Sequence, residues 1–288
     1  MTHLSELQRH IASMDELRDV VGAMRSLAGM RIQEGQHALP GVRRYAEAMA
    51  DAIGAALLLL PRPDLTAPAR GRRALLLFAP EHGFVGGLNE ALIEKAAAAA
   101  TPQPVLFVLG SRGAVRAREQ GLSVAWTWPM ATRVASAPQS VGDLTTELFR
   151  RIAAGEIARV EIIFARSRQG EATTIEQRQL FPLDLASLSK RRPRDAPLVN
   201  LAPQILLEKL MLEYVFALLT EAAIESVASE NAARFAAMEA AFDNVTQKLE
   251  QLRQSARQER QSEITTELLE LVTGAEAIER PPDRRRRR

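Results

Sequence analysis

The feature that most constrains the fold of this chain is the distribution of its prolines. The 288 residues include 15 prolines, with none before Pro40, none over 204–280, and thirteen from Pro40 to Pro203. Proline breaks the interior of a helix, because it lacks the N–H donor and its ring clashes with the preceding turn. The sequence therefore predicts two long helices that flank a mixed middle section.

The first proline-free end carries one stripe of apolar residues at helical spacing. All steps but the last are of three or four residues, which is typical of one helix face. The stripe comprises Leu4, Leu7, Ile11, Met14, Leu17, Val21, Met24, Leu27 and Ile32. We expect this helix to be kinked or interrupted at Pro40-Gly41 and to continue to about residue 60.

The C-terminal end shows the heptad spacing of a coiled coil, with alternating steps of three and four. Its seam comprises Phe235, Met238, Phe242, Val245, Leu249, Leu252 and Ala256, and it resumes at Ile264, Leu268, Leu271, Ala275 and Ile278. A helix over 204–279 would be about 110 Å long, longer than the N-terminal helix. We expect the two ends to pair as an antiparallel coiled coil and the surplus apolar stripe to pack on another protein.

The middle section changes period. Short apolar runs at 73–79, 104–109, 123–127 and 160–165 alternate with helical stretches at 89–100, 114–120 and 141–154, and 171–180 is typical of an edge strand. This alternation predicts a parallel or mixed α/β sheet. The expected fold is a long antiparallel coiled coil with an inserted Rossmann-like α/β domain. Its segments are an N-terminal helix over 1–60, the α/β domain over 72–188, a linker over 189–203, a C-terminal helix over 204–280 and a tail over 281–288.

The basic pI of about 9.3 is a property of the tail. Five of the 37 basic residues are Arg284 to Arg288, so the other 283 residues hold 32 basic against 35 acidic side chains. Five arginines can bind nucleic acid or anionic lipid. Because no aromatic residue interleaves them and no second basic patch supports them, we interpret the run as a solvated tail and predict no nucleic-acid partner.

Composition excludes several classes of protein. The absence of Cys excludes a disulfide framework, zinc ribbons and thiol chemistry. The longest apolar run, Ala52 to Leu60, has nine residues where a membrane helix needs about twenty. The first residues mix charged and apolar side chains and do not form a secretory signal. We expect a soluble, cytoplasmic chain.

Two glycine-rich turns lie where a phosphate loop would lie, each after an expected strand and before a helix. The turn over 81–89 has neither Gly-x-Gly-x-x-Gly nor Gly-Lys-Ser/Thr, and the turn over 110–113 offers Ser111 as a helix N-cap and a weak anion site. The four histidines lack metal spacing, and no catalytic triad is evident. We interpret both turns as structural and predict no catalytic residue, cofactor or metal. A stand-alone nucleotide- or phosphate-binding α/β protein and a coiled-coil adaptor that uses the basic tail are the alternatives.

Several motifs resemble those of one family, the gamma subunits of F-type ATP synthases, over almost the whole chain. Residues 229–238 (SENAARFAAM) resemble S-E-x-A-A-R-M-x-A-M, residues 260–268 resemble R-Q-x-x-I-T-x-E-I, and residues 272–277 resemble V-x-G-A-E-A. Residues 7–11 resemble I-R-R-R-I, and the segment from Ala23 resembles A-M-x-M-V-A-A-S-K. Residues 82–89 and 110–113 resemble R-G-L-C-G-G-L-N and G-S-K-G.

The resemblance implies a central rotor shaft that is not itself catalytic. The coiled coil would lie in the cavity of a hexamer of alpha and beta subunits, and the α/β domain would stand with epsilon on the c-ring, at the cytoplasmic face of the bacterial inner membrane. Association with the membrane would occur only through the complex. The implied contacts with alpha and beta are Met24, Arg31, Arg234, Arg260, Gln261, Thr265 and Glu267, while Leu271, Val272 and Ile278 would turn in a collar that acts as a bearing.

The chain departs from the family pattern at a few positions. Gly22 stands where many members have Lys, Arg31 replaces the Lys of A-A-S-K, and Phe84-Val85 replaces Leu-Cys. Gly22 and Gly29 each cost a helix about 1 kcal/mol relative to Ala. These departures indicate a divergent bacterial member.

Overall fold

The computed structural model describes residues 3–60, 71–167, 173–191 and 197–279, with side chains up to Ala275. Two helices dominate: α1 (His3–Ala56), followed by a 3₁₀ turn (Leu57–Leu59), and α6 (Pro203–Glu279). The chain forms two compact units, one of residues 1–24 with 238–288 and one of residues 25–237. Both helices have residues in each unit.

Helix α1 passes through Pro40 without ending, so the expected interruption at Pro40-Gly41 does not occur. Proline at this position removes one hydrogen bond, to the carbonyl of Gln36. Gln36, Pro40 and Gly41 all lie on the exposed face of the helix, where water can satisfy that carbonyl. The expected N-terminal helix is therefore continuous through Pro40.

In the first unit the two helix ends run antiparallel, as the heptad seam predicts. Arg253 of α6 forms an ion pair with Asp15 of α1 at 2.8 Å, and Phe242 packs against Gly22. The seam residues Met238 and Leu249 are buried. The sequence wrongly placed Leu17 on the inner face of α1, since this residue is 44% exposed. The face that contacts α6 runs through Val21 and the neighbouring Gly22.

The same antiparallel pairing occurs in the second unit. Phe235 lies over Gly29, where a Cβ atom would be 3.5 Å from the ring, and Ala228 lies over Gly35, where a Cβ would be 2.9 Å from the Ala228 Cβ. Leu27, expected on the inner face, is 44% exposed. Glycines on α1 thus provide the space into which larger side chains of α6 fit.

The middle of the chain folds into a five-stranded sheet that agrees closely with the expected strands. Its strands are β1 (Arg72–Phe78), β2 (Val105–Leu109), β3 (Val124–Trp128), β4 (Ile157–Arg166) and β5 (Thr174–Phe181). Their order is β3-β2-β1-β4-β5, with all pairs parallel except β4 and β5. The first four strands have the order of a Rossmann sheet, and β5 is the expected edge strand.

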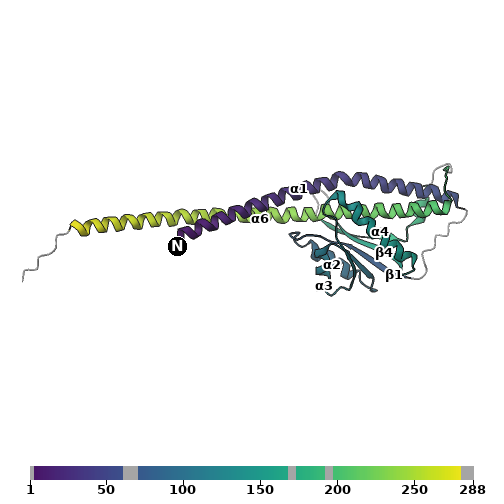
Figure 1. Cartoon of the computed structure of the whole chain (residues 1–288), viewed down its shortest axis with the longest axis horizontal. Coiled ribbons are helices and arrows are strands. Elements are labelled where there is room, and N and C mark those ends of the chain that lie inside the picture. Colours follow the sequence, from purple (N-terminus) through teal and green to yellow (C-terminus); the bar gives the residue numbers. More distant parts are fainter. Residues whose placement is uncertain (1–2, 61–70, 168–172, 192–196, 280–288) are drawn as a thin grey trace, which may run out of the picture. The chain divides into compact units, whose positions relative to one another are not determined.

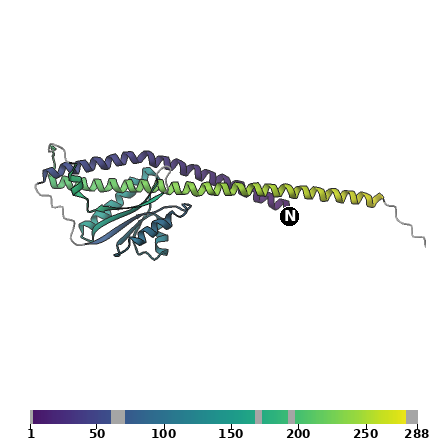
Figure 2. The same ribbon diagram turned by 180° about the vertical axis from the view of Figure 1, so that it is seen from behind.

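Helices cover both faces of this sheet. They are α2 (Leu88–Ala98), α3 (Ser111–Glu119) and α4 (Ala137–Ala153), and a short helix α5 (Leu185–Ser189), which the sequence did not predict, follows β5. Alternate residues of β1 point to opposite faces: Leu76 and Phe78 pack with α4 and α6, whereas Leu75 and Leu77 pack with α2 and α3. Figures 1 and 2 show the sheet between these two sets of helices.

Helix α6 is therefore part of the α/β domain as well as of the helix pair. Its residues Val215, Leu219, Ala223 and Val227 belong to the same buried cluster as β1 and β4. The sequence predicted an insert that sits to one side of the coiled coil. In the structure, the second unit has α6 as one of its layers.

The glycines of α1 that face α6 yield a prediction about stability. We expect Gly35→Ala to destabilise the chain by about 1–3 kcal/mol, because the new Cβ would overlap Ala228. Gly29→Ala places its Cβ at ordinary contact distance from Phe235 and should be neutral or stabilising by up to about 1 kcal/mol. Urea denaturation of the two variants checks this order, and a more damaging change at Gly29 would contradict it.

Candidate functional site at the middle and end of helix α6

The middle of α6 is buried on every side. Residues 221–231 (EAAIESVASEN) are all less than one-tenth exposed, although they include three glutamates, two serines and an asparagine. A charge in such a place is stable only if it is paired and hydrogen-bonded. The partners of Glu221, Glu225 and Glu230 therefore determine what this segment does.

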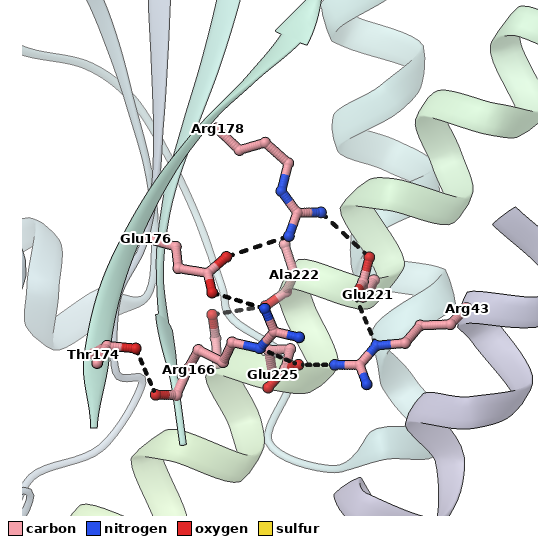
Figure 3. A network of polar contacts seen from close by, with 9 residues as sticks. Arg43, Arg166, Thr174, Glu176, Arg178, Glu221, Ala222 and Glu225 are labelled. Atoms are coloured by element: carbon pink, nitrogen blue, oxygen red, sulfur yellow. Dashed lines mark hydrogen bonds and ion pairs between the residues drawn. The ribbon is translucent and has the colours of Figure 1, made fainter. Parts of the chain in front are cut away.

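Glu221 and Glu225 belong to a closed ion ring in which three arginines and three glutamates alternate (Figure 3). The ring runs through Arg43 of α1, Glu221 of α6, Arg178 and Glu176 of β5, Arg166 of β4 and Glu225 of α6. Arg43 Nε lies 2.9 Å from Glu221 and Arg166 Nη1 lies 2.8 Å from Glu176, while Arg166 Nε is 3.2 Å from Glu225. The ion ring thus connects α1, α6 and two strands.

The pKa values of the ring follow from burial and pairing. Burial raises the pKa of Glu225 above its ordinary value, although the positive charges of Arg166 and Arg43 act to lower it. Burial also acts to raise the pKa of Glu176, but the hydrogen bond and charge of Arg166 outweigh it and lower that pKa. Because folded Glu225 holds its proton more tightly than the unfolded chain does, ionising it costs stability as the pH rises above its ordinary pKa.

Glu230 binds the turn that follows β1. Its carboxylate accepts hydrogen bonds from the backbone N–H groups of Glu81, at 3.2 Å, and of His82, at 3.4 Å. It also pairs with Arg234 at 2.5 Å, and Arg234 donates to the carbonyl of Gly83 at 3.3 Å. Two side chains of α6 thus hold three successive residues of the turn.

The Glu81 side chain in turn binds the neighbouring strand ends. It accepts hydrogen bonds from the Ser111 N–H at 3.0 Å, the Ser111 hydroxyl at 2.6 Å and the Met130 N–H at 2.9 Å. Burial acts to raise its pKa, but these hydrogen bonds outweigh burial and lower the pKa of Glu81. The carboxylate lies at the N-terminus of α3, the helix after β2, and a helix N-terminus favours an anion.

The second glycine-rich turn, over residues 110–113, has a structural role. Gly110 has φ +115°, and a Cβ there would lie 2.1 Å from the Ala79 carbonyl oxygen; a Cβ at Gly113 would lie 2.1 Å from the Ala79 Cβ. The expectation that Ser111 caps α3 is wrong, because Gly110 is the N-cap and Ser111 donates to Glu81. These glycines allow the end of β1 and the start of α3 to approach closely.

The residues that the resemblance assigns to partners lie in different surroundings. Met24 and Arg31 are partly exposed on α1. Arg260 lines a groove of about 320 Å³ with Leu4, Gln8, Ile11, Arg253, Ala256 and Arg257. Gln261, Thr265, Glu267, Leu271 and Val272 follow on exposed turns of α6. The side chain of Ile278 and the tail Arg284–Arg288 lie outside the described residues.

Arg234 differs from the other assigned residues because it is buried, with 7% of its surface exposed. Its guanidinium donates to Asn231, Glu230 and Gly83, all within the chain. The structure therefore gives Arg234 an internal role and does not place it on the surface.

Sequence reasoning missed the ion ring and the contacts of Glu81 and Glu230. A signal for them existed: Glu221 and Glu225 are one helical turn apart within a long apolar run, and Glu230 follows them. Charges within an apolar helix must be paired. Their partners come from α1, β4, β5 and the first turn, which no local pattern identifies.

Two further findings concern the described part of the chain only. Its His, Asp and Glu residues nowhere form a group of three or more that could hold a metal ion. Within the same residues, no helix combines the length and the hydropathy that a membrane span requires.

The ion ring predicts unequal effects at two neighbouring arginines. Arg43→Met leaves Glu221 and Glu225 with one arginine each, and we expect it to lower the free energy of unfolding by about 2 kcal/mol, less than for a fully buried pair because Arg43 is partly exposed. Arg44→Met changes an exposed arginine and should cost less than about 0.5 kcal/mol. Equal costs in urea denaturation would show that the ring adds nothing measurable.

The lowered pKa of Glu81 predicts how the stability of the chain depends on pH. Because its folded pKa is lowered, its contribution is fully present above its ordinary pKa near 4.5 and is lost as the pH falls through the folded value. Glu81→Gln should cost about 1 kcal/mol at pH 7, and the difference from the wild type should shrink below pH 4.5. Denaturation at several pH values measures it, with exposed Glu94→Gln as control. A difference that grew on acidification would oppose this assignment.

Comparisons with known proteins agree with the fold and the motifs. The sequence model of the family described as ATP synthase matches residues 3–278. The ATP synthase gamma chain of Nocardia farcinica is 28% identical, over 99% of this chain and all of that relative.

Solved structures show the same fold. In the rotor of the Euglena gracilis mitochondrial ATP synthase, a chain at 11% identity aligns with a TM-score of 0.60 over 91% of this chain and 98% of its own length. In the central stalk and c-ring structure of the Tetrahymena thermophila mitochondrial ATP synthase, a chain at 18% identity aligns with a TM-score of 0.53. The alignment covers 77% of this chain and 99% of that one. Since the family model spans nearly the whole sequence, the chain belongs to the gamma-subunit family of ATP synthases.

Proposed function

We propose that this chain is the rotating central shaft of a bacterial F-type ATP synthase, which couples ion flow through a membrane ring to ATP synthesis or hydrolysis on beta subunits. Members of the gamma family are non-catalytic stalk subunits, and the chemistry belongs to their partners. Glu81 occupies the N-terminus of α3, and the turn before α2 has neither phosphate-loop motif, which argues against the alternative of a stand-alone nucleotide-binding protein.

The observation that carries this proposal is the exposed apolar end of α6. Every described side chain from Ile264 to Ala275 is exposed, and among them Ile264, Leu268, Leu271 and Val272 are 51–70% exposed. A patch of this kind marks a protein–protein contact. The collar of an alpha–beta hexamer fits it, with Leu271, Val272 and Ile278 in the bearing and Arg260, Gln261, Thr265 and Glu267 in contact with alpha and beta below it.

Helix α1 carries exposed apolar side chains in each of the two units. Val20 and Met30 are 57% and 59% exposed, and Leu17 and Leu27 accompany them. Met24 and Arg31 lie in the same stretch of sequence, and we assign them to contacts with alpha and beta. Arg234 is left out of this set because its side chain is buried.

Rotation would act through unequal contacts. A subunit can shift a partner's conformational equilibrium only if it binds two conformations with different free energy. A shaft with different side chains on each face presents a different surface to each of three beta subunits in turn. The binding affinities of the three catalytic sites would then change in sequence as the shaft rotates.

The α/β domain would form the foot of the shaft, together with epsilon and the c-ring, at the cytoplasmic face of the inner membrane. The exposed residues Leu198, Val199, Leu201 and Ile205, just before and at the start of α6, support a further protein contact in the second unit. Attachment to the membrane would then be indirect, through the ring.

Coexpression with the alpha and beta subunits encoded in the same genome tests the proposal. We expect the three chains to copurify as one complex with ATPase activity, because the exposed end of α6 requires a covering surface. A chain that stays a soluble monomer in their presence would refute the assignment. Such a monomer with affinity for a nucleotide would favour the alternative function.

Truncation separates the apolar end of α6 from the tail. Removing residues 271–288 should reduce assembly or torque severalfold, whereas removing only Arg284–Arg288 should have little effect, because the bearing residues remain. Yield of the complex and rotation of a bead attached to the shaft measure the two variants. Equal losses would show that the tail takes part in the contact.

A further inference from the structure

The turn over residues 81–84 has an unusual conformation and a cluster of buried charges behind it. Phe84 has φ +62°, the left-handed region that a bulky side chain rarely adopts, and its ring is 69% exposed. No other described residue except glycine has a positive φ. A strained backbone of this kind persists only where its surroundings hold it in place.

Helix α6 supplies those surroundings. Glu230 accepts from the N–H groups of residues 81 and 82, and Arg234 donates to the carbonyl of residue 83, so three polar groups just before Phe84 are fixed. Both side chains are buried. Arg234 is oriented by Asn231, whose amide group donates to the Val227 carbonyl one turn earlier in α6. The strain at Phe84 is thus opposed by hydrogen bonds that involve charged groups, the stronger class.

The same turn is tied to the rest of the sheet through Glu81. Its backbone N–H is bound by α6, while its carboxylate binds the first residue of α3 and Met130, which follows β3. The Gly110 N–H donates to the Trp128 carbonyl at 2.8 Å, which connects the ends of β2 and β3 directly. A continuous set of hydrogen bonds therefore runs from α6 to the carboxyl ends of β1, β2 and β3.

We propose that Glu230, Arg234 and Glu81 form a turn latch that holds the strained 81–84 turn on α6 and makes the α/β domain and the helix move as one body. Glu230 and Arg234 are positioning residues in this role. The hydrophobic packing of α6 on the sheet resists separation but lacks direction. The ion ring supplies directional contacts to β4 and β5, and the turn latch supplies them at the carboxyl ends of β1, β2 and β3. The latch itself follows from this chain alone, and its role in rotation rests on the proposed function.

Hydrogen exchange on the full chain tests the latch. Glu230→Gln should raise the amide exchange rate of residues 81–84 about tenfold, because a neutral amide cannot accept from both backbone N–H groups and neutralise Arg234. The rate in β1 should not change. Glu208→Gln, an exposed glutamate of α6 in the same unit, is the matched control.

A second substitution separates a latch from a general loss of stability. Asparagine tolerates the left-handed region, so Phe84→Asn should relieve strain and recover at least about half of the lost protection in the Glu230→Gln background. If Glu230→Gln does not fold, Arg234→Lys replaces it, since lysine keeps the charge but cannot reach Asn231 and Gly83 together. Unchanged exchange at 81–84, or no recovery with Phe84→Asn, would overturn the inference.

The assembled complex tests the role in rotation. The chain has no Cys, so Gln120→Cys, at the exposed C-cap of α3, gives this chain one attachment point for a bead on hexamers fixed to a surface. We expect Glu230→Gln to increase the variance of the bead angle at rest at least about twofold, with ATP hydrolysis unchanged. If the bead angle varies equally in the wild type and in Glu230→Gln complexes that assemble normally, the role of the turn latch in rotation is refuted and the proposed function stands. Failure of the wild type to assemble would instead refute the proposed function.

Discussion

The structure depends on how charged side chains are satisfied within a helix segment that has no solvent-facing side. Residues 221–231 of α6 are enclosed, yet three of them are glutamates. Each ionised carboxylate in such surroundings would be strongly destabilising without a partner. Glu221 and Glu225 are neutralised by arginines from α1, β4 and β5, and Glu230 by Arg234 and the turn after β1. Helix α1, the edge of the sheet and the first turn must therefore all be in place before this helix can be buried.

The periodicity of the sequence predicted most elements of the fold. The strands after residue 72, the helices between them and the edge strand agree with the structure, because period and proline are local signals. The helix is not interrupted at Pro40, whose cost is small on an exposed face. The prediction was wrong at the role of α6 over Val215–Val227, where apolar residues occur on all sides of the helix. A helix buried all round has no amphipathic pattern from which to infer its second layer.

The candidate site was predicted only in part, for a physical reason. Residues 260–272 were found through motifs, and their contacts with partners stay predictions. The ion ring and the turn latch join residues far apart in the chain, such as Arg43 with Glu225 and Glu81 with Glu230, and no spacing rule relates them. Gly22 is explained in part by its partner across the helix pair, because a Cβ there would lie 3.3 Å from the Phe242 ring, closer than ordinary contact. Its cost in helix propensity is thus offset by the close packing of a large side chain of α6.

The carboxylate of Glu81 at the start of α3 has a consequence for the binding of free anions. An open helix N-terminus can bind an anion from solution. Here the ligand is covalently part of the chain, so its effective concentration at the site reaches the millimolar range or more and a free anion would have to compete with it. The N-terminus of α3 is therefore permanently occupied, whatever the concentration of nucleotide in the cell.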